Sequence, residues 1–172
     1  MFSARIHHVA LAINTLLTKS AKHARSPLLL LIRLYWGWQF FVTGKAHLAH
    51  LQDTTEFFTT LHLPAPRFQA ILAGSTESIG GLLLLFGLGS RLISVPLMFT
   101  MVIAYLTADL DKVKGIFHNL DAFVTATPFL FLLAAALVFC FGSGAISLDR
   151  LLSSLAGRQS TTRAINAHLQ LN

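Results

Sequence analysis

One acidic and one basic residue lie inside long apolar stretches of this chain, where charged side chains are rare. Glu77 lies in the middle of a run that is otherwise uncharged from Phe68 to Leu88. Arg33 interrupts a second apolar run, which begins at Pro27. A charge at the centre of a bilayer costs about 3 kcal/mol on insertion scales, so both side chains should face the protein interior, a polar cavity or each other. We expect Arg33 and Glu77 to form an ion pair between two helices.

Two roles are open for this pair. It could simply lock two helices together. Alternatively, both groups could line a pocket in which Glu77 exchanges protons while a quinone headgroup binds beside aromatic residues of the first run. The aromatic candidates are Tyr35, Trp36 and Trp38. Lys45 could belong to this pocket or could extend its ammonium group to the water interface on the outer side of the membrane.

The composition is typical of an integral membrane protein. Of the 172 residues, 54% are hydrophobic and only 12% are charged. Four apolar runs approach the length of about 17 to 25 residues that a membrane helix needs. They cover residues 27–43, 68–88, 92–108 and 123–141. Because a soluble chain of this size could not shield four such helices from water, we expect an all-α bundle of four antiparallel transmembrane helices.

The chain divides into three expected parts. Residues 1–26 place apolar side chains at helical spacing among basic ones, which predicts an amphipathic helix on the membrane surface. A secretory signal is the competing interpretation of this segment. Residues 27–155 form the expected membrane domain, in which Pro27 suits the first turn of a helix. Residues 156–172 are expected to form a polar cytoplasmic tail.

The basic residues predict the orientation in the membrane. With four spans, eight Lys and Arg residues lie on the side of the termini and four lie on the other side. The positive-inside rule then places both termini in the cytoplasm, with the protein in the inner (cell) membrane. The basic residues flank apolar runs instead of interleaving with aromatics, so we expect no nucleic-acid partner.

Small and polar residues predict further local features. Glycines in the first two runs should let these helices approach closely, and Glu77 lies on the glycine-lined face of the second. A short helix between the two runs is expected to be capped by Asp53 or Thr54. Another helix should restart at Ser147 after a glycine-rich break. The glycines that share these faces are Gly37 and Gly44 on the first helix and Gly74 and Gly81 on the second.

Few residues suggest a metal or a cofactor. His47 and His50 would share a helical face if HLAH is helical and could then begin a metal site, but solvated histidines are the alternative and no metal is assigned. The four runs contain no histidine to ligate a haem, and no dinucleotide-binding motif is present. Cys140 is the single cysteine, which excludes an internal disulfide and a CxxC pair, and we expect it to be buried.

Four segments, in their order and spacing, resemble the DoxX family of small membrane proteins. They are RLYWGWQFFVTGK, LHLPAP, ESIGGLLLLFGLGSRL and FGSGAISLDRLL, between about Arg33 and Leu152. The resemblance implies a four-helix membrane protein associated with oxidoreductase systems. Some members are similar to a subunit of thiosulfate:quinone oxidoreductase, and others are linked to redox-stress complexes. The charged family positions fall on Arg33, Lys45 and Glu77, with Ser147 and Asp149 in the terminal motif.

These observations lead to one expected function and two alternatives. We expect a membrane subunit of a redox system that interacts with the quinone pool or anchors an oxidoreductase complex. It would work with other membrane or redox subunits, and a homo-oligomer is also open. No redox centre of its own is visible in the sequence, so whether the chain is itself an enzyme is left open. The alternatives are a small proton- or cation-coupled transporter, with Glu77 as the ion site, and a non-catalytic structural subunit.

Overall fold

The computed structural model describes residues 2–155, and these residues contain helices and no strand. The predicted all-α class is therefore confirmed. The predicted tail, residues 156–172, lies outside the described residues. The helices are α1 (Phe2–Ala49), α2 (Leu51–Thr60), α3 (Pro66–Phe86), α4 (Ser90–Thr107), α5 (Leu110–Lys114), α6 (Leu120–Val124) and α7 (Thr127–Phe141). Residues 148–155 are also helical.

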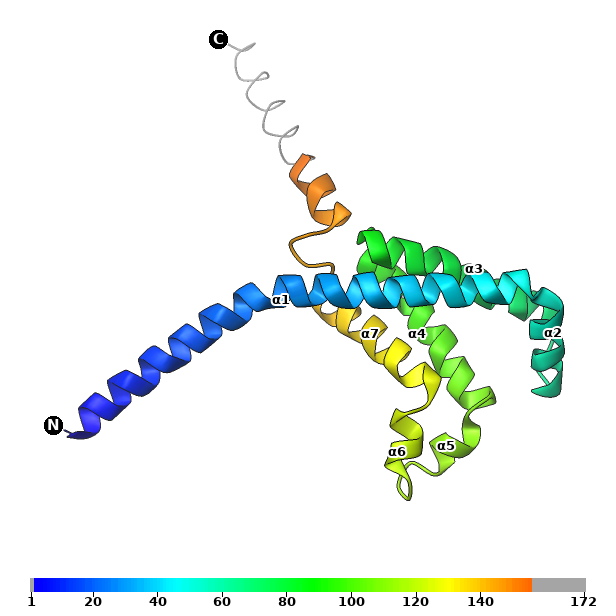
Figure 1. The fold of residues 1–172 in the computed structure, drawn as a ribbon, viewed down its shortest axis with the longest axis horizontal. Helices are drawn as coiled ribbons and strands as arrows, with labels where there is room; N and C mark the ends of the chain where they lie inside the picture. Colours follow the sequence, from blue (N-terminus) through cyan, green and yellow to red (C-terminus); the bar gives the residue numbers. More distant parts are fainter. Residues whose placement is uncertain (1, 156–172) are drawn as a thin grey trace, which may run out of the picture.

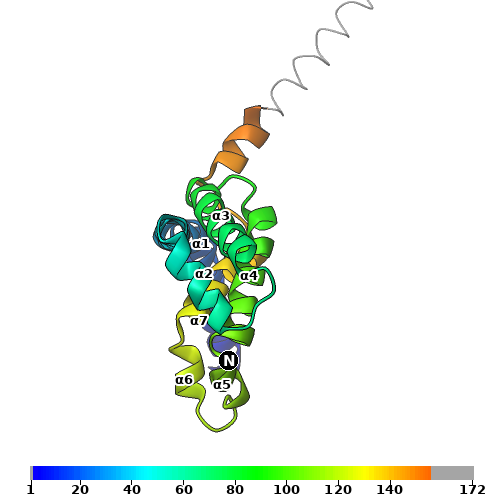
Figure 2. The same ribbon diagram turned by 90° about the vertical axis from the view of Figure 1, so that its right-hand side faces the viewer.

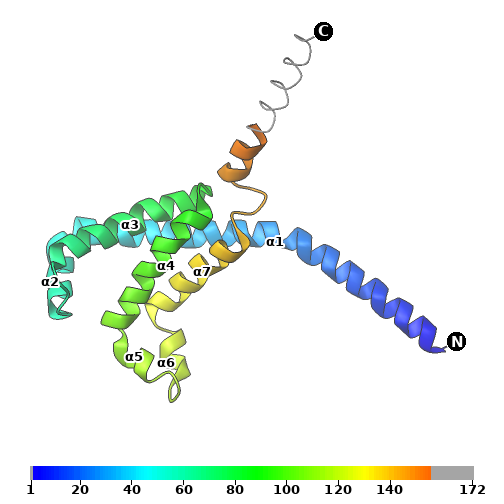
Figure 3. The ribbon, with the colours of Figure 1, turned by 180° about the vertical axis from the view of Figure 1, so that it is seen from behind.

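The long helices form two pairs that cross each other. The second half of α1 runs alongside α3, and α4 runs alongside α7 (Figures 1 and 3). The short helices α5 and α6 close one end of the second pair, and α2 packs against α3 (Figure 2). The buried core lies where the two pairs meet and includes Phe40, Leu84, Leu97 and Phe131. The first part of α1 extends away from this core (Figure 1).

The outer faces of the bundle are apolar. Both α3 and α4 are long and apolar enough to cross a membrane, whereas α7 is apolar but shorter. Only 39% of the apolar window of α3 and 28% of that of α4 is buried, whereas the core helix of a soluble protein would be mostly buried. Phe68 and Phe99 are each 65% exposed and Leu92 is 81% exposed. Such exposed apolar faces are typical of helices that contact lipid, and the count of four spans stays a prediction.

Glycine lets α1 and α3 touch along their backbones. A Cβ atom added at Gly44 would lie 2.6 Å from the carbonyl oxygen of Gly74. One added at Gly81 would lie 2.6 Å from the carbonyl oxygen of Gly37. Real Cβ contacts are not this short, so only glycine fits at these positions. The predicted close approach of the two helices is confirmed.

Two predicted helix starts are wrong. Pro27 lies inside α1, which continues without interruption from Phe2 to Ala49. The helix bends between its blue and cyan parts (Figure 1), as expected where proline removes one backbone hydrogen bond. Neither Asp53 nor Thr54 caps α2, because that helix begins at Leu51. Thr54 instead lies inside α2, and its hydroxyl donates to the carbonyl of His50, 3.0 Å away.

The last apolar run is divided between two helices. We expected one span over residues 123–141, but α6 ends at Val124 and α7 begins at Thr127. Pro128 lies in the first turn of α7, where its missing N–H is harmless. The side chain of Asn119 caps α6 by accepting from the backbone N–H of Ala122, 3.0 Å away.

Two glycines shape the turn between α3 and α4. Gly87 and Gly89 adopt φ values of 71° and 58°, which disfavour other residues. The N–H groups of Leu88 and Gly87 donate to the carbonyls of Leu83 and Leu84, at 2.9 and 3.1 Å. This pair of bonds is a Schellman motif, which ends α3 and reverses the chain.

Candidate functional site

Arg33 and Glu77 are both buried, at 1% and 4% exposure, but they do not pair with each other. Arg33 Nε donates to the carbonyl of Leu84, 3.2 Å away, and Nη1 donates to the carbonyl of Ser143. Glu77 Oε2 instead lies 3.1 Å from His47 Nδ1. The predicted Arg33–Glu77 ion pair is therefore wrong.

The register of the two helices explains this difference. Arg33 lies beside the last turn of α3, where helix carbonyls lack partners within the helix. Glu77 lies nine residues before the end of α3 at Phe86, or about 13 Å along its axis. Gly87 leaves space for the guanidinium, because a Cβ atom there would lie 2.7 Å from Arg33 Cζ. Arg33 thus caps the carboxyl end of α3.

The contact between His47 and Glu77 forms a second polar centre at the α1–α3 interface. The side chain of Glu77 is 6% exposed and that of His47 is 36% exposed, so His47 links the carboxylate to the outside of the bundle. Although His47 Nδ1 and Glu77 Oε2 are within ion-pair distance, neither makes a well-aligned hydrogen bond with a described group, and nor does Ser78 Oγ. Buried polar atoms in this state are uncommon and often mark the place of a water, an ion or a ligand.

His47 was not among the residues expected in a polar centre. The first span was predicted to end at Thr43, which would leave His47 in an outer loop, but α1 continues to Ala49. His50 follows the helix and lies 3.8 Å from Asp53, so HLAH does not present two histidines on one helical face. Within residues 2–155, no three His, Cys, Asp or Glu side chains gather as metal ligands would.

Of the aromatic residues of the predicted pocket, Tyr35 and Trp36 are in ring contact with each other, with centroids 5.1 Å apart. Trp36 packs against Phe131, with ring centroids 4.9 Å apart in the bundle core. Tyr35 and Trp38 are 60% and 54% exposed on the outside of α1, and Lys45 is exposed as well. The structure does not bring these four residues together into one pocket.

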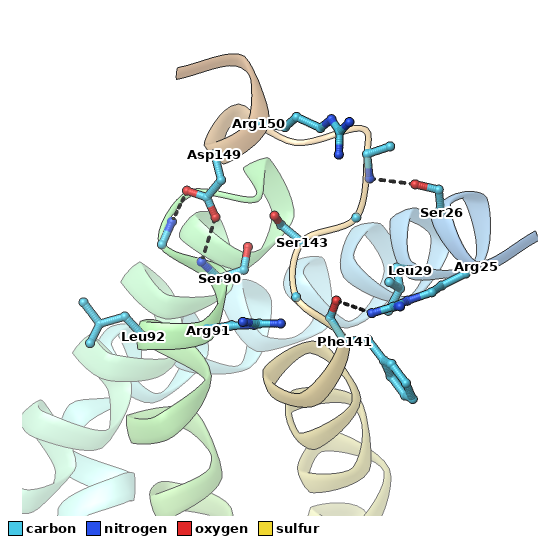
Figure 4. A pocket seen from close by; sticks show the side chains of 14 residues that line it. Arg25, Ser26, Leu29, Ser90, Arg91, Leu92, Phe141, Ser143, Asp149 and Arg150 are labelled. Atoms are coloured by element: carbon cyan, nitrogen blue, oxygen red, sulfur yellow. Dashed lines mark hydrogen bonds between the residues drawn. The ribbon is translucent and has the colours of Figure 1, made fainter. Parts of the chain in front are cut away.

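The terminal motif fastens the segment after α7 to the turn between α3 and α4. The carboxylate of Asp149 accepts from the N–H groups of Gly89 and Ser90, at 2.8 and 3.3 Å (Figure 4). A negative charge is favourable there because the N-terminus of α4 is the positive end of the helix dipole. Ser147 Oγ accepts from the N–H of Arg150, 3.3 Å away, which confirms the helix restart predicted at Ser147.

Two more arginines bind carbonyls at the end of α7. Arg25 Nη2 donates to the carbonyl of Phe141, 2.8 Å away, and its guanidinium lies over the ring of the same residue. Arg91 Nη2 makes a longer contact of 3.5 Å with the carbonyl of Cys140. Cys140 itself is exposed, so its predicted burial is wrong.

Comparisons with known proteins identify the family of this chain. The DoxX family profile matches residues 28–110. "Putative oxidoreductase CatD" of Bacillus subtilis (strain 168) is 32% identical over 120 residues, which cover 70% of this chain and 83% of that protein. No solved structure matches the chain significantly. Because the family profile matches and the alignment with this relative covers most of both chains, this chain belongs to the DoxX family of membrane proteins.

Proposed function

We propose that this protein is a membrane subunit of a redox system and that a quinone headgroup binds at the His47–Glu77 pair. The observation that carries the proposal is the contact between His47 Nδ1 and Glu77 Oε2, two buried polar atoms that lie 3.1 Å apart and make no well-aligned hydrogen bond with a described group. The name of the Bacillus relative, which describes an oxidoreductase, supports a redox role.

The chemistry of the pair suits a quinone. Reduction of a quinone to a quinol takes up two electrons and two protons, so a site needs hydrogen-bonding groups and a proton route. Imidazole and carboxylate are the usual protein groups for proton transfer. The His47 side chain is partly exposed and the Glu77 side chain is nearly enclosed. Together they form a path along which a proton can pass from the surface of the bundle to its interior. The electrons would come from a partner subunit.

The proposed topology has four spans in the cell membrane with both termini in the cytoplasm. The spans are the part of α1 that packs on α3, together with α3, α4 and α7. In this arrangement the His47–Glu77 pair lies at membrane depth, because Glu77 is near the middle of α3. A lipid-soluble quinone could then reach the pair from the bilayer.

The variant Glu77→Gln tests the proposal because it keeps the size of the side chain and removes the carboxylate. Protein in lipid nanodiscs would be titrated with a short-chain quinone, and quenching of the fluorescence of Trp36 and Trp38 would report binding. We expect quinone affinity to fall about tenfold, the size expected when a charged hydrogen-bonding group is lost. Glu56→Gln is the control, because Glu56 is an exposed carboxylate on α2.

Other outcomes would point to other functions. Unchanged quinone affinity in Glu77→Gln and in His47→Gln would overturn the quinone proposal. Proton flux into liposomes that disappears in Glu77→Gln, without quinone binding by the parent protein, would indicate the transporter. Loss of folding or of assembly with partner subunits in both variants would indicate a structural role.

A further inference from the structure

We propose that a hollow at one end of the bundle binds the phosphoryl group of an anionic ligand, either a phospholipid headgroup or a soluble phosphate. The hollow has a volume of about 680 Å³ and lies between the end of α7, the start of α4 and α1. It is separate from the His47–Glu77 pair, so the proposal does not depend on the proposed quinone site.

Three arginines from three separate parts of the chain surround the hollow. Arg25 comes from α1, Arg91 from α4 and Arg150 from the segment after α7, and all three line the hollow. The guanidinium groups of Arg25 and Arg91 approach each other beside Phe141, and that of Arg150 lies apart from them (Figure 4). Asp149 is the single acid in the lining. Three positive charges and one negative charge leave a net charge of +2 in the lining, which favours an anion.

Among the described residues, few groups use the hydrogen-bonding capacity of these arginines. The carboxylate oxygens of Asp149 already accept from the N–H groups of Gly89 and Ser90. Arg25 and Arg91 each use one nitrogen on a carbonyl, and no side-chain contact of Arg150 is found within residues 2–155. Since a guanidinium has five N–H donors in a planar fork, it matches phosphoryl oxygens well.

Ser90 provides an independent indication of a ligand. It is 1% exposed, it lines the hollow, and its Oγ has no hydrogen bond with any described group. Ser90 is also the first residue of α4, so its hydroxyl lies at the positive end of an 18-residue helix. A phosphoryl oxygen in the hollow would give this hydroxyl the acceptor that it lacks.

The position of the hollow suits a lipid headgroup. It lies where α3 ends and α4 begins, and these are the two helices long enough to cross the bilayer. Leu92 in its lining is 81% exposed and Phe141 is 47% exposed, so apolar side chains adjoin the arginines. Basic groups beside apolar surface are what a phospholipid meets at the membrane interface.

The test measures binding to the full-length protein in a neutral detergent by isothermal titration calorimetry. The probes are short-chain phosphatidylglycerol, short-chain phosphatidylcholine and inorganic phosphate, at constant ionic strength. Arg150→Gln is the first variant, because Arg150 makes no described side-chain contact that folding would lose. Ser90→Ala is the second, and Arg67→Gln, an exposed arginine at the opposite end of α3, is the control.

We expect the parent protein and Arg67→Gln to bind at least one anionic probe. Arg150→Gln should bind it about tenfold more weakly, as expected for the loss of a charge-assisted contact, and Ser90→Ala should bind it more weakly too. Binding of phosphatidylglycerol alone identifies a lipid headgroup, and equal binding of inorganic phosphate identifies a soluble phosphate. No binding of phosphatidylglycerol or inorganic phosphate, affinity for phosphatidylcholine equal to that for phosphatidylglycerol, or equal affinity in Arg150→Gln and the parent, would overturn the proposal.

Discussion

At the scale of single residues, Arg33 shows how a deeply buried cation can be satisfied without a carboxylate in contact. Its guanidinium donates to the carbonyls of Leu84 and Ser143. Leu84 lies in the last turn of α3, and Ser143 follows the end of α7. Carbonyl groups at helix ends carry partial negative charge and have no partner within the helix. Arg33 therefore joins the end of α3 to the segment after α7.

This role predicts that substitution of Arg33 destabilises the fold. Arg33→Met removes the guanidinium donor from both carbonyls, so that of Ser143 loses this partner and that of Leu84 keeps the N–H of Gly87, at a cost of about 3 kcal/mol. Arg33→Lys keeps the charge but replaces the planar fork with a single ammonium, so its cost should be intermediate. Thermal unfolding followed by circular dichroism in detergent micelles measures the order, with Arg67→Met as the exposed control. An Arg33→Met midpoint equal to that of the parent would contradict this role.

The residue types of the polar centre are readable from the sequence, but their partners are not. A charged side chain in an apolar run needs polar partners inside the protein, so the sequence alone indicates that Arg33 and Glu77 are buried polar residues. Which groups satisfy them depends on the register of α1 against α3. The glycine contacts set that register, and it places His47, not Arg33, beside Glu77.

At the scale of elements, hydropathy located α3 and α4 to within about two residues. Predicted runs 68–88 and 92–108 correspond to Pro66–Phe86 and Ser90–Thr107. The ends of α1 and α7 were less predictable because they depend on tertiary contacts. Pro27 is compatible with a helix interior as well as a first turn, and α1 continues past Thr43 because Gly44 packs against Gly74 of α3 and His47 contacts Glu77.

The glycine contact between α1 and α3 predicts the effect of adding one methyl group. Gly44→Ala would place a Cβ atom 2.6 Å from the carbonyl oxygen of Gly74, so the two helices must separate. We expect a loss of about 1 to 3 kcal/mol, typical of overpacking, and a lower thermal midpoint. Gly115→Ala is the control, because its Cβ would meet only the carbonyl oxygens of Asp111 and Lys112 in the adjacent α5, at 3.2 and 3.9 Å. Equal midpoints for both variants would show that the close approach is unimportant for stability.

At the scale of the whole molecule, charge is distributed unequally between the two ends of the bundle. Arg25, Arg91 and Arg150 gather around the hollow at one end. At the other end, Lys112 pairs with Asp109 at 2.7 Å, and Asp111 and Asp121 lie on α5 and α6. Under the positive-inside rule, we expect the arginine-rich end to face the cytoplasm.

This asymmetry predicts which loops are accessible from outside the cell. In a Cys140→Ser background, Gly115→Cys places a thiol between α5 and α6, and Ser153→Cys places one beyond α7. A membrane-impermeant maleimide added to spheroplasts should label the thiol at position 115 directly and the thiol at position 153 only after lysis. The opposite pattern would reverse the orientation, and labelling of both thiols in spheroplasts would show that the two ends lie on the same side. Because the hollow lies at the arginine-rich end, the expected result would also limit its ligand to lipids of the inner leaflet or to cytoplasmic phosphate.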